Sequence, residues 1–117
     1  MITAEFTTHK DSGSISLRMT GHAGAAEAGS DIVCAAASIL AYTVAQTLQF
    51  MHEQGSLQKK PHIQLKEGDT IIVAKPKPES YAEVLHTFFV AQVGFHLISH
   101  NYAQYVRLKS FGEGESS

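Results

Sequence analysis

The chain has 117 residues, enough for one domain with its own hydrophobic core. With 44% hydrophobic and 17% charged residues, its composition is that of a globular protein rather than a disordered one. The formal net charge of -2 gives no electrostatic reason to expect direct binding to nucleic acid or to an anionic membrane.

The cysteine content and the apolar segments set the expected compartment. The single cysteine cannot form an intramolecular disulfide, and the N-terminus lacks the features of a secretory signal. We expect no apolar stretch to reach the roughly 18 to 20 residues that cross a bilayer. These features predict a soluble protein of the reducing cytoplasm, without a membrane partner.

Two strands are predicted at the N-terminus. Residues 2–8 and 14–20 alternate apolar with polar side chains, which is the period of a half-buried strand. The side chains expected to face the core are Ile2, Ala4, Phe6, Ile15, Leu17 and Met19. Turn-forming residues separate the two segments, so an N-terminal hairpin is expected.

A long helix is predicted over residues 31–54, because apolar residues recur near the 3.6-residue period and Gly55 can end it. Ser30 or Asp31 is a suitable N-cap, since its side-chain oxygen can accept from a free amide of the first turn. Cys34 would then lie in that first turn. A second stripe of small side chains would allow a neighbouring element to approach closely: Cys34, Ser38, Ala41 and Ala45.

The second half of the chain repeats the pattern. Residues 62–66 and 70–75 flank a turn and predict a second hairpin. Residues 79–99 predict a second helix, whose core-facing stripe is Val84, Phe88, Ala91, Phe95 and Ile98. A further apolar strip on that helix could be a dimer surface: Val90, Val93 and Leu97. Residues 103–108 predict a last strand.

The order strand, strand, helix, strand, strand, helix, strand predicts a two-layer α+β fold, with two helices on one face of a largely antiparallel sheet. The order of the strands within the sheet does not follow from this pattern. Residues 1–111 would form this single domain, and residues 112–117 a flexible, solvated C-terminal tail.

The stretch GHAGAAEAGSDIVCAA, residues 21–36, carries the candidate chemistry. A thiolate attacks carbonyl groups, but lowering a thiol pKa from about 8.5 to about 6 takes roughly 3.4 kcal/mol. A helix N-terminus supplies only about 0.3 to 1 kcal/mol, or about 2 in a favourable site. A protonated imidazole about 4 Å away would add on the order of 4 kcal/mol. His22 is the nearest histidine upstream of Cys34, so the two could act as nucleophile and general base.

The same stretch offers three further roles. Amides at the helix start could stabilise an oxyanion. Asp31 could orient His22 or only cap the helix, and the pattern does not choose between the two. Gly21, Gly24 and Gly29 would let a mobile loop open for substrate and close over it.

Simpler interpretations compete with this chemistry. A free cysteine is commonly a small buried hydrophobe, and a glycine-rich loop is common without a catalytic role. His96 and His100 stand four apart, but they lack a nearby acidic or cysteine partner, so no metal and no cofactor is expected. A modest basic patch fits solvated turns and could also meet RNA or an acidic partner: Lys59, Lys60, Lys75 and Lys77.

A resemblance to a known family favours the catalytic interpretation of Cys34 and His22. GHA at 21–23, Gly29, DIVCA at 31–35 and Ser38 together resemble the motif of the ribosomal-processing cysteine protease Prp family. The similarity runs along nearly the full chain, and the central motif is its specific part. It departs from the family in the loop, where Ala25 and Ala28 stand at positions that often hold larger or aromatic side chains.

The resemblance implies a cysteine endopeptidase that removes a short N-terminal extension from a large-subunit ribosomal protein. It implies that Cys34 and His22 form a catalytic dyad under a mobile loop of residues 23–30, and that the protein is a homodimer. The alternative is a non-catalytic interaction module for ribosome assembly, which would leave the placement of Cys34 and His22 unexplained.

Overall fold

The structure is a computed structural model that describes residues 1–23 and 30–112. Its elements along the chain are β1 (Ile2–His9), β2 (Ser14–Gly21), α1 (Ser30–Glu53), β3 (His62–Lys66), β4 (Asp69–Ala74), the 3-10 turn η1 (Pro78–Ser80), α2 (Tyr81–Asn101) and β5 (Val106–Lys109). Gly24 and Gly29 of the expected mobile loop, and residues 113–117 of the expected tail, lie outside the described residues.

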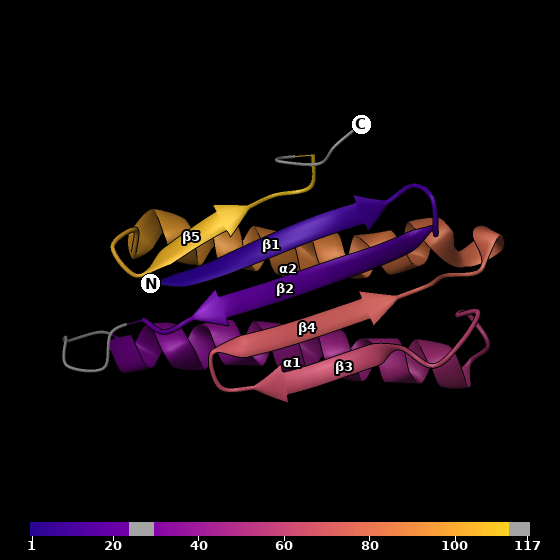
Figure 1. Ribbon diagram of the computed structural model, residues 1–117, viewed down its shortest axis with the longest axis horizontal. Coiled ribbons are helices and arrows are strands. Elements are labelled where there is room, and N and C mark those ends of the chain that lie inside the picture. The colour runs from indigo at the N-terminus through magenta and orange to yellow at the C-terminus, as the bar shows by residue number, and fades with distance from the viewer. Residues whose placement is uncertain (24–29, 113–117) are drawn as a thin grey trace.

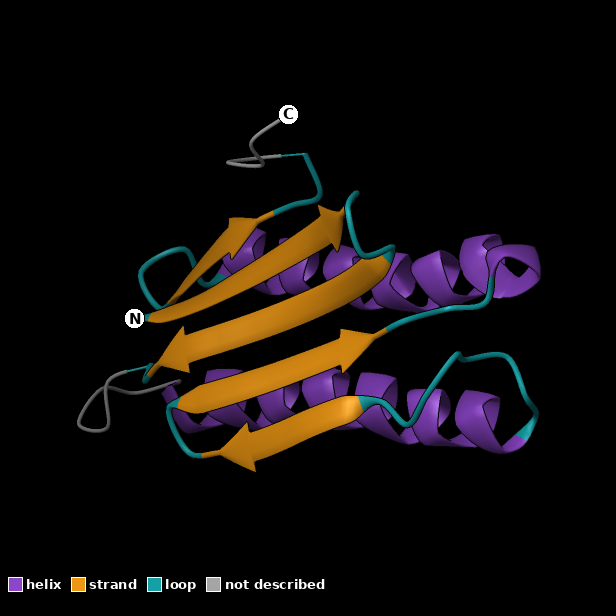
Figure 2. Cartoon of the chain, turned by 45° about the vertical axis from the view of Figure 1, so that its right-hand side comes forward, coloured by secondary structure: helices purple, strands orange, loops and turns teal. Residues whose placement is uncertain are grey.

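The strands form one sheet with the order β3-β4-β2-β1-β5. Neighbouring strands are antiparallel except for β1 and β5, which run parallel. Both helices lie on the same face of this sheet, with α1 behind β3 and β4 and α2 behind β1 and β5 (Figures 1 and 2). The predicted two-layer α+β fold is therefore confirmed.

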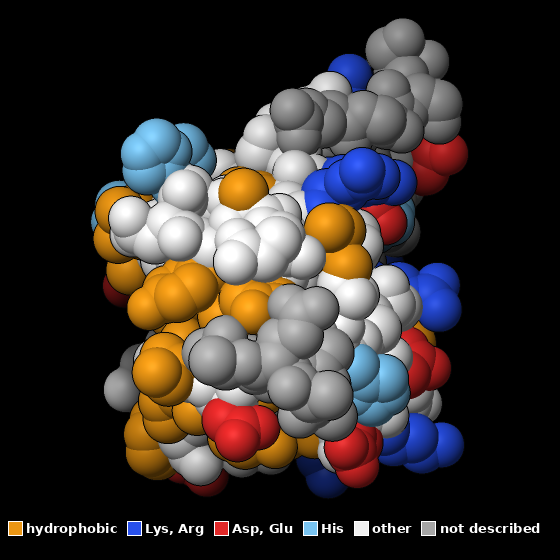
Figure 3. Space-filling view, turned by 90° about the vertical axis from the view of Figure 1, so that its left-hand side faces the viewer, with side chains coloured by type: hydrophobic (Ala, Val, Ile, Leu, Met, Phe, Trp, Pro, Cys, Tyr) orange, Lys and Arg blue, Asp and Glu red, His pale blue; other side chains and the backbone are white. Residues whose placement is uncertain are grey.

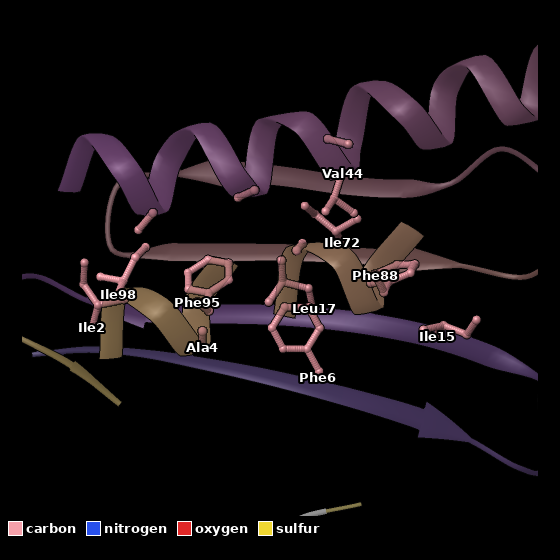
Figure 4. Close-up of a cluster of buried hydrophobic side chains, with 14 of the residues drawn as sticks. Ile2, Ala4, Phe6, Ile15, Leu17, Val44, Ile72, Phe88, Phe95 and Ile98 are labelled. Atoms are coloured by element: carbon pink, nitrogen blue, oxygen red, sulfur yellow. The ribbon is translucent and has the colours of Figure 1, made fainter. Parts of the chain in front are cut away.

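The core lies between the sheet and the helices, on the side of the sheet to which the alternating apolar residues of the strands point. Five of the six strand residues expected to face the core are buried, and Met19 is partly buried against them. The rings of Phe6 and Phe95 meet edge to face with 5.8 Å between their centroids, and Phe111 contacts Phe6 in the same way. Figure 4 shows Phe6 and Leu17 from the sheet beside Phe88 and Phe95 from α2.

The two helices pack against each other as well as against the sheet. All five residues of the predicted core stripe of α2 are buried. Of the predicted stripe of small side chains on α1, Ala41 and Ala45 are buried, whereas Cys34 and Ser38 are only partly buried. Gly94 of α2 lies so close to Leu40 of α1 that an added Cβ would be 2.7 Å from Leu40 Cδ2.

Two segments differ from the prediction. The second helix starts with η1 and continues as α2 to Asn101, because Pro78 fits a first turn where its missing N–H is not needed. The last strand begins at Val106, since residues 102–105 form turns in which Tyr105 N–H donates to Tyr102 C=O at 2.9 Å.

Helix α1 also corrects the expectation about apolar segments. Residues 32–51 contain no charged side chain, and by length and composition alone the segment Asp31–Glu53 could cross a bilayer. In the fold, one side of this helix packs into the core through Val33, Val44 and Leu48. Its apolar composition thus reflects two apolar faces, one buried against the sheet and one exposed.

Candidate active site

A cavity of about 250 Å³ lies at one end of the sheet, the left-hand end in Figure 1. It lies where β2 ends, where α1 begins and where the turn between β3 and β4 passes. The lining residues are Ile2, Met19, Gly21, His22, Cys34, Ala37, Ser38, Tyr42, Lys66, Glu67, Gly68 and Thr70. The structure therefore brings together the two residues that the sequence singled out, His22 and Cys34.

His22 follows the last residue of β2 directly, and the backbone around it is closely packed. The N–H of Gly21 donates to the carbonyl of Gly68 at 3.0 Å, which ties the end of β2 to the β3–β4 turn. Gly21 has a positive φ of 89°, and a Cβ there would collide with the carbonyl of Met1. Only glycine fits this position, so the direction in which the chain delivers His22 is fixed.

Cys34 is half-buried on the face of α1 that borders the cavity. Since α1 begins at Ser30, Cys34 is its fifth residue and lies just past the first turn, whereas the sequence predicted it within that turn. Ala37, Ser38 and Tyr42 follow on the same helical face, so this wall extends about 12 Å at 1.5 Å per residue. A wall of that length matches roughly three to four residues of an extended peptide.

Asp31 lies in the first turn of α1, is exposed and does not line the cavity. Within the described part of the chain, its carboxylate makes no hydrogen bond or ion pair with His22. A carboxylate at this end of a helix is still favourable, because the N-terminal end carries the positive pole of the helix dipole. The placement of Asp31 suits helix stabilisation better than orientation of the imidazole.

The Cys34 thiol and the His22 imidazole line the same cavity, so both could contact one bound substrate. Among residues 1–23 and 30–112, no hydrogen bond joins the side chains of His22 and Cys34 directly. Catalytic hydrogen bonds in free enzymes are often long and tighten when substrate binds. A thiol and an imidazole that line one cavity are the groups required for nucleophilic attack on a carbonyl carbon.

Comparison with known families decides what kind of enzyme this is. The family described as cysteine protease Prp matches residues 1–107, which extend from β1 into β5. The chain belongs to the cysteine protease Prp family. It is a cysteine protease, and the alternative of a non-catalytic interaction module is set aside.

Solved structures share the fold over almost their full length. The ribosomal processing protease Prp of Staphylococcus aureus, in complex with a covalently linked product peptide, is 25% identical with a TM-score of 0.67. The match covers 95% of this chain and 99% of that chain. Protein SMU.848 of Streptococcus mutans is 27% identical with a TM-score of 0.67, over 93% of this chain and 92% of that chain. No curated protein sequence matches the chain.

The histidines that could suggest a metal site lie away from His22 and Cys34. No group of three His, Cys, Asp or Glu side chains able to hold a metal occurs among the described residues. His96 lines a second hollow of about 400 Å³ between α2 and β5, which includes neither Cys34 nor His22.

The β3–β4 turn is the part of this Prp-family site that the sequence did not reveal. Lys66, Glu67 and Gly68 line the cavity, although the sequence marked Lys66 only as the end of a strand and Glu67 and Gly68 only as part of a hairpin turn. Tyr42, two turns of helix after Cys34, was missed too. Its spacing from Cys34 and Ser38 was the available signal, because all three lie on one face of a helix.

Proposed function

We propose that this protein is an endopeptidase that removes a short N-terminal extension from a large-subunit ribosomal protein, with Cys34 as nucleophile and His22 as general base and acid. The observation that carries the proposal is that the chain belongs to a cysteine protease family and has one cysteine. Cys34 shares a cavity with His22, as a nucleophile must with its base.

The chemistry follows from these two side chains. The thiolate of Cys34 attacks the carbonyl carbon of the scissile peptide bond, and His22 donates a proton to the departing amine. The bond to nitrogen breaks and a thioester to Cys34 remains. His22 then takes a proton from water, which attacks the thioester and releases the new carboxyl end. The covalently linked product peptide in the S. aureus relative supports a covalent step of this kind.

The negative oxygen of the tetrahedral intermediate needs hydrogen-bond donors. The Cys34 amide is not one of them, because as the fifth residue of α1 it donates to the carbonyl one turn earlier. The donors in our proposal are amides of the first turn of α1, since the first four N–H groups of a helix have no partner inside it. These groups also lie at the positive end of the helix dipole.

The substrate is proposed from the relatives and from the shape of the cavity. The S. aureus relative is a ribosomal processing protease, which supports a ribosomal protein as the substrate here. The wall from Cys34 to Tyr42 suits an extended peptide segment rather than a folded surface. A terminal extension can adopt that extended form without unfolding the rest of its protein.

We infer further that the protein is a cytoplasmic homodimer. A lone reactive thiol stays reduced in the cytoplasm. Hydrophobic side chains gather over the outer side of the helix layer, on the left of Figure 3. The exposed hydrophobic side chains of α1 and α2 include Ile39, Val90, Val93 and Leu97, each between 47% and 61% exposed. An apolar surface of this kind on two neighbouring helices suits contact with a second copy.

The test is mass spectrometry of the N-terminal peptide of the large-subunit ribosomal protein from the same organism, after incubation with purified protein. One cut by the wild type, none by Cys34→Ala and a strongly reduced rate with His22→Ala are expected. His52→Ala is the matched control, since His52 is an exposed histidine at the far end of α1 and its variant should cleave as the wild type does.

Two results would contradict the proposal. Cleavage by folded Cys34→Ala would exclude Cys34 as nucleophile. The second result is a ribosomal peptide that stays intact although the folded wild-type protein cleaves another peptide. This would exclude the ribosomal substrate but would leave the protease assignment unchanged.

A further inference from the structure

The imidazole of His22 rests against the backbone of the β3–β4 turn. A Cβ added to Gly68 would lie 2.7 Å from His22 Nε2 and 3.0 Å from Cε1, with Cδ2 next at 3.6 Å. The ring therefore approaches Gly68 with its tip, at the place where any other residue would begin its side chain. This holds for either flip of the ring, because both flips present the same tip.

Gly68 is itself held firmly in relation to His22. Strands β2 and β4 pair up to Thr20 and Asp69, and the hydrogen bond from Gly21 N–H to Gly68 C=O continues the ladder by one residue. Asp69 is further fixed by Gln64, whose amide donates to its carboxylate at 3.3 Å. The surface under His22 is thus the backbone of a turn that is tied to the sheet on both sides.

We propose that Gly68 is the positioning residue of His22: by having no side chain, it provides the surface on which the imidazole is set for reaction with Cys34. This inference rests on the proposed function, in which His22 is the general base. In this inference Gly68, and not Asp31, orients the ring of His22, since Asp31 is exposed and does not line the cavity.

The contact distances give the size of the expected effect. With a methyl group at position 68, the ring tip must retreat from 2.7 Å to reach an ordinary contact distance of 3.4 Å. The ladder holds the turn in place, so the imidazole moves by about 0.7 Å. A displacement near 1 Å in a catalytic group lowers a rate by roughly 100-fold. The fold should survive, because the atoms in the way belong to the end of a flexible side chain.

Gly13 provides a matched control. It lies in the β1–β2 turn with a positive φ of 73°, close to the 79° of Gly68, but nothing lies within 4 Å of an added Cβ. Alanine at either position has the same backbone strain, and only the methyl group at position 68 meets His22. The pair Gly68→Asn and Gly13→Asn repeats the comparison with a residue that tolerates positive φ, should the alanine variants fold poorly.

The experiment has two readouts. One is kcat and KM for peptide cleavage, and the other is the rate at which iodoacetamide alkylates Cys34 across a range of pH. We expect Gly68→Ala to lower kcat roughly 100-fold with KM within about threefold. Its alkylation profile should shift toward that of His22→Ala. Gly13→Ala should match the wild type in both, and both glycine variants should have similar midpoints of urea unfolding.

The alkylation readout separates this inference from the proposed function. If the wild type cleaves no ribosomal peptide, the proposed substrate fails, but the pH profile still reports whether Gly68 sets the coupling of His22 to Cys34. A profile for Gly68→Ala that equals the wild-type profile would overturn the inference, as would equal losses in Gly13→Ala. The wild type alone gives a third check: an NMR contact between His22 Hε1 and Gly68 Hα is expected, and its absence would also overturn it.

Discussion

The contact between Gly94 and Leu40 gives a prediction whose sign depends on a neighbour. Gly94→Ala should stabilise a helix interior by about 0.8 to 1 kcal/mol through helix propensity. The new Cβ would lie 2.7 Å from Leu40 Cδ2 and 2.9 Å from Cδ1, however, and overpacking typically costs about 1 to 3 kcal/mol. The expected net change is a loss of up to about 2 kcal/mol in the free energy of unfolding.

The same substitution should become stabilising once Leu40 is shortened. In a Leu40→Ala background no side-chain carbon remains beyond Cβ to meet the new methyl group at position 94, so only the propensity gain of about 1 kcal/mol is left. The double-mutant cycle should therefore give a coupling of about 1 to 3 kcal/mol. The assay is urea unfolding of all four proteins at one protein concentration. Equal stabilisation by Gly94→Ala in both backgrounds would refute the close approach of α1 to α2 at this point.

Two further predictions concern the core and the outer helix face. Phe95→Ala should lower the free energy of unfolding by about 3 to 5 kcal/mol, since this ring is fully buried and packs on Phe6; a loss below about 1 kcal/mol in urea unfolding would contradict that packing. For the proposed homodimer, Val93→Glu should reduce the mass measured by light scattering from that of a dimer to that of a monomer, whereas Leu65→Glu, at a similarly exposed residue of β3, should leave it unchanged. A dimer that persists in Val93→Glu would argue against the exposed apolar face of α2 as the dimer interface.

The parts of the fold that the sequence predicted correctly are those set by local pattern. The alternation from Ile2 to Phe6 identified the buried side of β1, and the stripe from Val84 to Ile98 identified the buried side of α2. Both patterns record which side chains leave water, and this depends on residues close together in the chain. The element order predicted the two layers for the same reason.

The order of the strands in the sheet and the part of the cavity formed by the β3–β4 turn could not be predicted from local patterns in the sequence. The place of β5 beside β1 depends on pairing between residues about a hundred positions apart, and apolar alternation does not specify the partner of a strand. The contact of Gly68 with His22 has the same origin. The sequence showed that Gly68 belongs to a turn, but only the pairing of β2 with β4 places that turn beside His22.

This topology also explains why the site forms where it does. Because β2 and β4 are antiparallel, the residue after β2 must lie beside the turn that precedes β4. Helix α1 begins nine residues after Gly21, so its N-terminal end returns to the same end of the sheet, as Figure 1 shows. Three elements therefore meet whatever path the connection to α1 takes, and each supplies one part: His22, Cys34 and the β3–β4 turn. Within that turn, Gly68 is constrained both by its hydrogen bond to Gly21 and by the ring of His22.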